Sequence, residues 1–399
     1  MLGVAFATAA LIVVLSVFNG LEDLIRSLNV AFDPQLKIEA VRGKSFEFND
    51  TLANKIKSVE GVAILTEVIE DYVYIRYRQP DALPNDNEFE ESYQLPKGEA
   101  EMVVTMKGVS RNFIDQHRLD DHIVEGDMQL YKNNMPAAIL GKGIRNTLSV
   151  STENDFVPLK LYYVKNLKGG TLNPASMYSQ QFVMPAGVFS IEKNFDENYI
   201  FVPLEVAQEL MNYGNKRTSL EVQLGAKADQ IAVQSQLKKI LGPAFRVLTN
   251  DEQHRELYRI LKIEKLFMAL SLTLLLAISS INIFFSLMML VIDKKKDISI
   301  LASLGAAPAL IRKIFISEAF VIAGVGAFVG IFFGTFLCWL QDSMGLVGMG
   351  MENSVVLNYP VRLIFTDIVF AALAMVTITI TIAWLPAKAA AKSAEAEIL

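Results

Sequence analysis

The sequence predicts an α-helical membrane protein with four transmembrane helices and a large α+β domain inserted between the first and the second of them. Three observations support this fold class. Hydrophobic residues make up 52% of the 399 residues and charged residues only 20%, below the roughly 25% usual in globular proteins. Four stretches without Asp, Glu, Lys or Arg are long enough to cross a bilayer, at 1–21, 266–292, 319–340 and 368–387. Residues 22–265 alternate strand and helix patterns.

The charge balance excludes nucleic-acid binding as the main function. The chain carries 37 basic and 43 acidic residues, a formal net charge of −6, and residues 22–265 hold 29 and 35 of these. The acidic surplus therefore lies in the inserted domain, which offers polyanions no basic surface. The single cysteine, Cys338, lies within an apolar stretch, so no disulfide can form within the chain and a buried thiol is expected.

Lysine and arginine beside the apolar stretches predict the orientation in the membrane. Residues 293–313 carry five basic residues, whereas residues 341–367 carry only Arg362. Because basic loops stay in the cytoplasm, residues 293–313 and both termini are expected there, with residues 22–265 outside.

The first apolar stretch begins directly at Met1. A cleaved signal peptide is the alternative, but this stretch is longer than such a peptide and lacks its positive start, so a true transmembrane helix is favoured. We also expect that a cytoplasmic N-terminal segment is missing ahead of it.

The inserted domain is expected to mix strands, helices and two long loops. A helix capped by Asn49 is expected up to Ser58, another from Pro203 to Met211, and a third at 228–241, ended by Gly242. Residues 80–97 and 166–180 lack periodicity and are expected to be exposed loops. Strands are expected at 35–40, 73–78, 102–107, 182–191, 199–202 and 218–224.

The sequence shows no catalytic, cofactor or metal site. The nearest approach to a phosphate-binding GxxxxGK[ST] loop is Gly43-Lys44-Ser45, where Ile38 replaces the required first glycine. The three histidines form no metal-ligand pattern, and a dispersed catalytic triad would leave no pattern to find. Only Glu318 and Asp367 lie near the ends of apolar stretches, which disfavours an ion-driven carrier.

The third apolar stretch predicts close helix packing. Gly326, Gly330 and Gly334 recur every four residues, with Ala323 and Ala327 on an adjacent stripe. Small residues at this spacing let helix backbones approach closely in lipid. The partner helix could belong to the same chain or to a second protomer.

The loop between the second and third apolar stretches predicts a short amphipathic helix. Ile298, Leu301 and Leu304 are expected on one face, Gly305 can end the helix, and Pro308 can begin the next one. Such a helix could lie on the membrane surface or fit a groove on a cytoplasmic partner.

Several segments resemble the lipoprotein-releasing (Lol-type) ABC permeases, a branch of the macrolide-exporter and cell-division permease superfamily. The resemblance is carried by LSVFNG at 15–20, by DISILASLG at 297–305 within the longer segment 264–306, and by LPAKAA at 385–390. It is looser but collinear in the inserted domain, at 141–148, 187–203 and 247–265. The basic cytoplasmic helix that the family carries before its first span is absent here.

The resemblance implies a dimeric permease driven by a separate cytoplasmic ATPase. The short cytoplasmic helix would then be the coupling helix, with Asp297, Ile298, Leu301, Leu304 and Gly305 as its ATPase-facing residues. The partner permease could be a second copy or a related subunit.

The resemblance implies two further sites, which are assigned to residues of this chain by their position in the sequence. A hook loop that docks a periplasmic lipoprotein carrier would use Leu172, Pro174, Met177 and Tyr178, unless residues 166–180 are an ordinary solvent loop. A lipid-receiving cavity between two subunits would be lined by Val14, Phe18, Phe267 and Leu270, unless these residues only pack the helices.

The expected function is a non-catalytic permease subunit of the bacterial inner membrane that extracts lipoproteins for a periplasmic carrier. The alternatives are a macrolide-exporter-like efflux permease, or a cell-division-type permease that transmits force to a periplasmic cell-wall hydrolase. The expected division of the chain is helix 1 at 1–21, a periplasmic domain of porter-like and α+β subdomains at 22–265, helix 2 at 266–292, a cytoplasmic coupling loop at 293–313, helix 3 at 314–340, a short periplasmic loop at 341–363, helix 4 at 364–387 and a cytoplasmic tail at 388–399.

Overall fold

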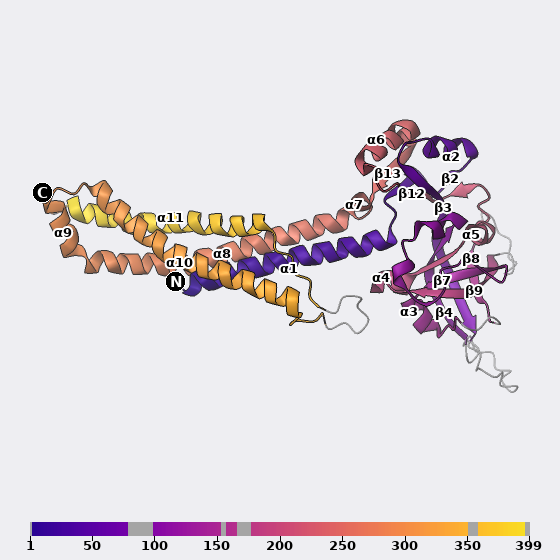
Figure 1. The fold of residues 1–399 in the computed structure, drawn as a ribbon, viewed down its shortest axis with the longest axis horizontal. Coiled ribbons are helices and arrows are strands. Elements are labelled where there is room, and N and C mark those ends of the chain that lie inside the picture. Colours follow the sequence, from indigo (N-terminus) through magenta and orange to yellow (C-terminus); the bar gives the residue numbers. More distant parts are fainter. Residues whose placement is uncertain (1, 79–98, 153–156, 166–176, 350–357, 396–399) are drawn as a thin grey trace. The chain divides into compact units, whose positions relative to one another are not determined.

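The computed structural model describes residues 2–78, 99–152, 157–165, 177–349 and 358–395 (Figure 1). The chain divides into two compact units. The helical unit lies within Met1–Ile25, Glu256–Met351 and Val356–Leu399, and the α+β unit lies within Arg26–Arg255.

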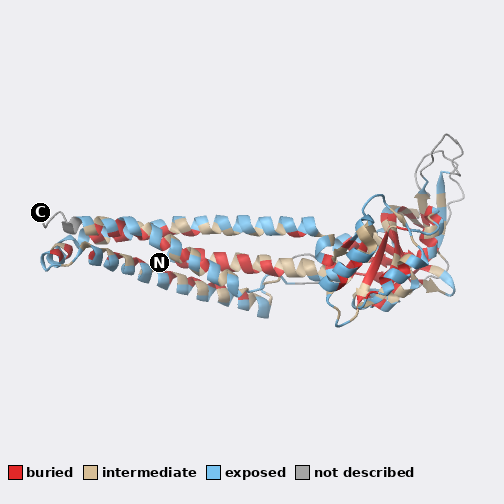
Figure 2. Cartoon of the chain, turned by 90° about the horizontal axis from the view of Figure 1, so that it is seen from above, coloured by how far each residue is buried: buried red, intermediate tan, exposed pale blue. Residues whose placement is uncertain are grey.

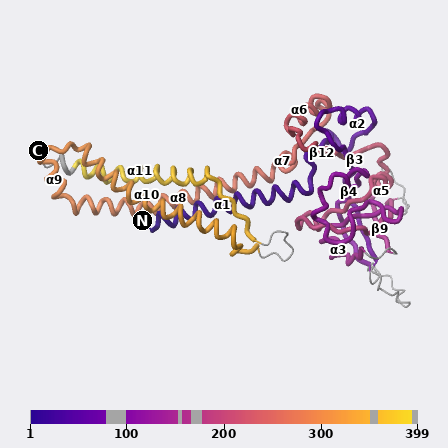
Figure 3. Tube along the Cα trace, viewed as in Figure 1, coloured from indigo at the N-terminus to yellow at the C-terminus, as the bar shows by residue number. Residues whose placement is uncertain are grey.

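The helical unit is built from long apolar helices. In the described ranges, four helices are long and apolar enough to cross a membrane: α1 (Leu2–Phe32), α8 (Arg255–Asp293), α10 (Pro308–Met344) and α11 (Phe365–Glu395). The short helix α9 (Lys295–Ser303) connects α8 to α10 (Figure 3). Pro308 occupies the first turn of α10, as the sequence predicted.

Two helices continue beyond the uncharged stretches from which they were predicted. Helix α1 runs past residue 21 to Phe32, and α8 begins at Arg255 rather than near residue 266. The first charged residue marks where a helix can leave the bilayer, but it does not end the helix, because Glu, Lys and Arg are good helix formers. The expected boundaries at 21 and 265 therefore fall inside helices.

The four long helices share one buried cluster. It combines residues of α1, α8, α10 and α11, and both buried and exposed residues occur along each of these helices (Figure 2). The cluster contains Val4, Ala7, Leu276, Ile283, Leu287, Ala319, Ala323, Met375 and Ala383. Cys338 is also buried, as expected.

The predicted glycine stripe packs against a helix of the same chain. Gly326, Gly330 and Gly334 are all buried on α10. A Cβ atom on Gly330 would lie 2.5 Å from the carbonyl oxygen of Ala5, and one on Gly334 would lie 3.1 Å from that of Ala9. Both contacts are with α1, so for these two glycines the partner helix lies within the chain.

The α+β unit surrounds a mixed sheet whose order is β13-β1-β12-β3-β4-β10-β7-β9-β5, with β8 paired to β3 and β9. Its strands are β1 (Leu36–Ala40), β3 (Val62–Arg78), β4 (Glu99–Val109), β5 (Ile123–Gly126), β7 (Met135–Gly141), β8 (Leu159–Val164), β9 (Tyr178–Phe189), β10 (Tyr199–Pro203), β12 (Ser219–Leu224) and β13 (Phe245–Thr249). The smaller strands are β2 (Phe46–Glu47), β6 (Tyr131–Lys132) and β11 (Lys216–Arg217). The helices are α2 (Asp50–Lys57), α3 (Lys142–Leu148), α4 (Lys193–Asn198), α5 (Leu204–Met211), α6 (Gln230–Leu241) and α7 (Asn250–Gln253).

The strand β3 joins two hydrophobic cores. Its first half pairs with β12 beside a core formed by β1, β13, α2 and α6. Its second half pairs with β4 and β8 beside a core that includes α3 and α5. The 17 residues of β3 thus form the continuous element of both cores.

Several predicted boundaries need correction. Helix α2 is capped by Asn49, as predicted, and ends at Lys57, one residue before the predicted end. Pro203, however, is the last residue of β10 and the N-cap of α5, not its first helical residue. Strand β9 begins at Tyr178, inside the segment that was expected to be a loop up to residue 180. Residues 80–97, the other expected loop, lie outside the described ranges.

A buried ion group holds the end of α1 within the α+β unit. Glu221 on β12 is fully buried, its Oε1 lies 2.6 Å from Nζ of Lys107, and its other oxygen pairs with Arg118. Arg118 also donates to the carbonyl of Phe32 at 3.1 Å, and Lys107 lies over the Phe32 ring. Burial alone would raise the pKa of Glu221, but the charges of Arg118 and Lys107 outweigh it and lower the pKa to about 2.

Candidate coupling and docking sites

The short helix α9 presents one buried and one exposed apolar surface. Ile298 and Ala302 are buried against α8, α10 and α11. Leu301 is 40% exposed, Ile300 60% and Leu304 79%. These three aliphatic side chains lie between two long helices and form an apolar surface that nothing in the described part of the chain covers. We call Ile300, Leu301 and Leu304 the α9 surface.

The expectation that Ile298, Leu301 and Leu304 share one face is therefore corrected. Each step of three residues turns a helix by about 300°, so successive side chains rotate by roughly 60°. Ile298 consequently faces the chain's own helices, while Leu304 faces away from them. Ile300 was missed in the sequence, although its position four residues before Leu304 could have indicated it.

The C-terminal end of α9 follows the predicted glycine signal, and its first turn carries an ion pair. Asp297 in the first turn pairs with Nζ of Lys294 at 3.0 Å. Gly305 has φ +92°, a left-handed conformation that favours glycine, and its amide donates to the carbonyl of Ala302. Gly305 thus ends the helix and fixes the direction in which Leu304 is presented.

The expected hook segment begins and ends on a β-hairpin. Strands β8 and β9 are antiparallel, with Val164 opposite Tyr178, and the amide of Lys165 donates to the carbonyl of Met177. Met177 and Tyr178 are nearly half exposed, at 46% and 45%. Leu172 and Pro174 lie outside the described ranges.

The four residues expected at a lipid cavity divide by helix. Val14 and Phe18 on α1 are half-buried, one turn apart. Phe267 and Leu270 on α8 are exposed, at 66% and 58%. Their role at a lipid cavity stays a prediction.

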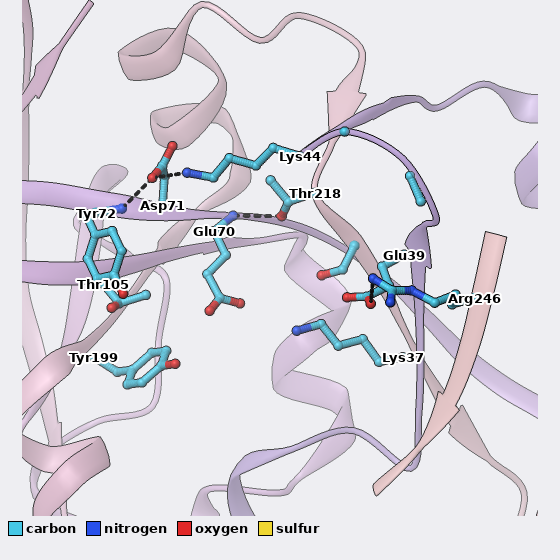
Figure 4. A pocket seen from close by; sticks show the side chains of 13 residues that line it. Lys37, Glu39, Lys44, Glu70, Asp71, Tyr72, Thr105, Tyr199, Thr218 and Arg246 are labelled. Carbon is cyan, nitrogen blue, oxygen red and sulfur yellow. Dashed lines mark hydrogen bonds and ion pairs between the residues drawn. The ribbon is translucent and has the colours of Figure 1, made fainter. Parts of the chain in front are cut away.

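A polar cavity of about 320 Å³ lies in the α+β unit (Figure 4). Its lining includes three basic and three acidic side chains. Lys44 pairs with Asp71, and Arg246 pairs with Glu39 at 2.8 Å. Because these charges neutralise one another, the cavity offers no net charge to an ionic ligand. No group of His, Cys, Asp or Glu residues suited to a metal ion occurs in the ranges that the structure describes.

The helical unit matches a known class of membrane protein. Residues 269–394, which run from α8 to α11, match the family described as FtsX-like permease C-terminal. Residues 269–394 are therefore similar to the C-terminal segment of FtsX-like permeases, and the four long apolar helices fit a membrane protein.

Curated relatives extend this similarity beyond the membrane segment. The chain is 25% identical over 319 residues to the lipoprotein-releasing system transmembrane protein LolC of Xylella fastidiosa, covering 77% of this chain and 76% of that protein. It is 23% identical, over an alignment of 422 residues, to the corresponding protein LolE of Haemophilus influenzae, covering 100% of this chain and 92% of that protein. The predicted resemblance to the lipoprotein-releasing ABC permeases is confirmed.

Among solved structures, the periplasmic region of MacB from Actinobacillus actinomycetemcomitans is similar to this chain. The identity is 10% and the TM-score 0.36, with 58% of this chain and 94% of that chain covered.

Proposed function

We propose that this chain is a permease subunit of an ATP-driven complex that extracts lipoproteins from the inner membrane and passes them to a periplasmic carrier. The observation that carries the proposal is the extent of the similarity. A match limited to residues 269–394 would fit any FtsX-like permease, but the lipoprotein-releasing relatives also align with the inserted domain. This extent favours lipoprotein release over efflux or cell-wall regulation.

In this proposal the α+β unit is periplasmic. The support is the basic loop at 293–313, which contains α9 and which the positive-inside rule assigns to the cytoplasm. Because α1 and α8 flank residues 33–254 in the chain, one crossing by each helix brings that segment to the opposite side.

The α9 surface is the proposed contact with a cytoplasmic ATPase. Leu304, Ile300 and Leu301 supply an exposed apolar patch at the end of two long helices. An exposed patch of this kind indicates a protein-binding site. Ile298 and Ala302 would transmit motion of the ATPase to α10 and α11, because they pack directly against those helices.

A carrier is required on physical grounds. Each methylene that leaves an apolar environment costs about 0.8 kcal/mol, so about three acyl chains of roughly fifteen methylenes would cost on the order of 36 kcal/mol in water. The lipid anchor must therefore pass from one apolar site to another. The β8–β9 hairpin, with Met177 and Tyr178 exposed at its described end, is the proposed docking element for that carrier.

The proposal is tested by two variants that interrupt different steps. In cells that depend on the variant chain, Leu304→Asp is expected to abolish recovery of the ATPase with the tagged chain and to leave lipoproteins in the inner membrane. Met177→Glu is expected to leave ATPase recovery unchanged but to reduce the lipoprotein bound to the carrier. Ile231→Asp, at a side chain 73% exposed on α6, is the control for a new charge on the surface.

Two outcomes would contradict the proposal. If cells with Leu304→Asp no longer yield the ATPase with the tagged chain yet deliver lipoproteins normally, the complex does not function in lipoprotein release. If Met177→Glu and Ile231→Asp behave alike, the hairpin is not the docking element.

A further inference from the structure

A polar group joins α1, α8 and α11. It lies near the N-terminal end of α8, whereas α9 follows the C-terminal end of that helix. It consists of Asn19 on α1, Lys265 on α8 and Asp367 on α11. The Asn19 side-chain amide donates to Oδ2 of Asp367 at 2.7 Å, and Nζ of Lys265 donates to Oδ1 of Asn19 at 2.6 Å. Nζ of Lys265 also lies 3.5 Å from Oδ2 of Asp367. One side chain from each helix therefore contacts both others.

The chemistry of the group suits a contact that can open and close. Asn19 is 3% exposed, and its amide has a donor for the anion and an acceptor for the cation. The Lys265 and Asp367 side chains are 29% and 18% exposed, so water can reach both charges. A charge near a span end without its partner is costly, which favours the closed arrangement. Water at the site lets the pair separate without burying a bare charge.

The neighbouring segment strengthens the same junction. The amide of Arg362 donates to the carbonyl of Ser16 at 2.9 Å, and its side chain pairs with Asp23. A Cβ atom on Gly20 would lie 2.4 Å from the carbonyl oxygen of Pro360, so only glycine fits there. The LSVFNG segment at 15–20 thus supplies a backbone acceptor, the bridging amide and a close backbone approach at one junction.

We propose that Asn19, Lys265 and Asp367 form a latch that holds α1 against α8 and α11, and that this latch opens and re-forms as the helices move. Residues predicted to face lipid flank the latch directly: Phe18 precedes Asn19, and Phe267 follows Lys265 by two positions. Only this link to lipid rests on the proposed function. The latch itself rests on the contacts among the three helices.

The native cysteine gives a direct measure of latch opening. Cys338 is the only cysteine of the chain and is 2% exposed on α10. Its side chain lies near Ser16 of α1. Separation of α1 would expose this thiol. The measurement is the rate at which N-ethylmaleimide alkylates Cys338 in the full-length chain, in native membranes and without added ATP.

Lys265→Met and Asn19→Leu are each expected to raise the alkylation rate about tenfold. The reason is that loss of one hydrogen bond to a charged group shifts the equilibrium between the closed and open latch by about this factor. Lys265→Arg is expected to keep the wild-type rate. The reversed pair, Lys265→Asp with Asp367→Lys, is expected to restore slow alkylation, because the Asn19 amide can turn over to match it. Lys262→Met, an exposed lysine one turn earlier on α8, is the matched control and is expected to change nothing.

Unchanged alkylation in Lys265→Met, or equal acceleration in Lys262→Met, would overturn the latch. If Lys265→Met does not accumulate in the membrane, the reversed pair decides: slow alkylation supports the latch, and fast alkylation or failure to accumulate overturns it. None of these readouts depends on lipoprotein, so the latch and the proposed function can fail separately.

Discussion

Glu221 is a single residue that fixes the last turn of α1 within the α+β unit. Its carboxylate has no contact with solvent, yet it stays ionised because Lys107 and Arg118 both approach it. The same two cations contact the ring and the carbonyl of Phe32. A charge on β12 therefore stabilises the position of a helix end that is distant in sequence.

Replacing this charge is expected to destabilise the unit strongly. Glu221→Gln leaves Lys107 and Arg118 buried without an anion and is expected to lower the free energy of unfolding by about 3–5 kcal/mol. Urea titration of the full-length chain, followed by proteolysis of the α+β unit, measures the change. Glu39→Gln, which breaks the more exposed pair with Arg246, should cost less than about 1 kcal/mol. Equal losses in the two variants would contradict this account.

Acid should remove the same stabilisation. The folded state lowers the pKa of Glu221 from 4.5 to about 2, so its contribution is complete above pH 4.5 and is lost as the pH falls toward 2. The contribution is on the order of 3 kcal/mol. Over this range the stability of the wild-type protein should fall more steeply than that of Glu221→Gln. Parallel pH profiles would show that Glu221 titrates alike in the folded and unfolded states.

At the scale of elements, the α1–α10 contact depends on the absence of side chains. Gly330 brings the backbone of α10 against Ala5 and Thr8 of α1. Close packing of small residues is the main source of stability between helices in lipid, where apolar surfaces gain nothing by leaving the solvent.

Gly330→Ala is expected to lower the thermal unfolding midpoint of the full-length chain in detergent. The new methyl would lie 2.5 Å from the carbonyl oxygen of Ala5, and overpacking of this kind costs roughly 1–3 kcal/mol. Gly324→Ala is the matched control, because a methyl at that position meets no atom within 4 Å. A lower midpoint in Gly324→Ala as well would mean that helix flexibility, not the α1 contact, requires glycine.

The sequence predicted elements better than it predicted contacts. Uncharged stretches located the long helices, and the four-residue spacing of Gly326, Gly330 and Gly334 predicted close packing. It could not identify α1 as the partner, because spacing defines a face and not its neighbour. Strand β3 was predicted only from residue 73, since residues 62–72 carry buried side chains on both faces and lack strict alternation.

The contacts among Asn19, Lys265 and Asp367 could not be predicted from the sequence for a different reason. Asn19 and Lys265 are 246 residues apart, and Asn19 and Asp367 are 348 apart. Only folding brings such residues together, and each alone is an ordinary polar residue near a span end. The sites implied by family resemblance, such as the hook and the lipid cavity, likewise stay predictions until they are tested by mutation.

The whole molecule combines a helical unit, similar over residues 269–394 to the C-terminal segment of FtsX-like permeases, with a large inserted α+β unit. The exposed apolar α9 surface and the described end of the β8–β9 hairpin lie on different units. In the proposed complex one receives motion from an ATPase and the other meets the carrier. The proposal is that the long helices convert nucleotide hydrolysis into movement of a lipid anchor.

The most direct measurement is ATP-dependent release from reconstituted vesicles. The complex that copurifies with the full-length chain would be incorporated with a labelled lipoprotein, and the soluble carrier added outside. The account predicts that lipoprotein moves from the vesicles to the carrier with ATP, and that none moves with a non-hydrolysable analogue or without the carrier. Steady ATP hydrolysis while all the lipoprotein stays in the vesicles would contradict it.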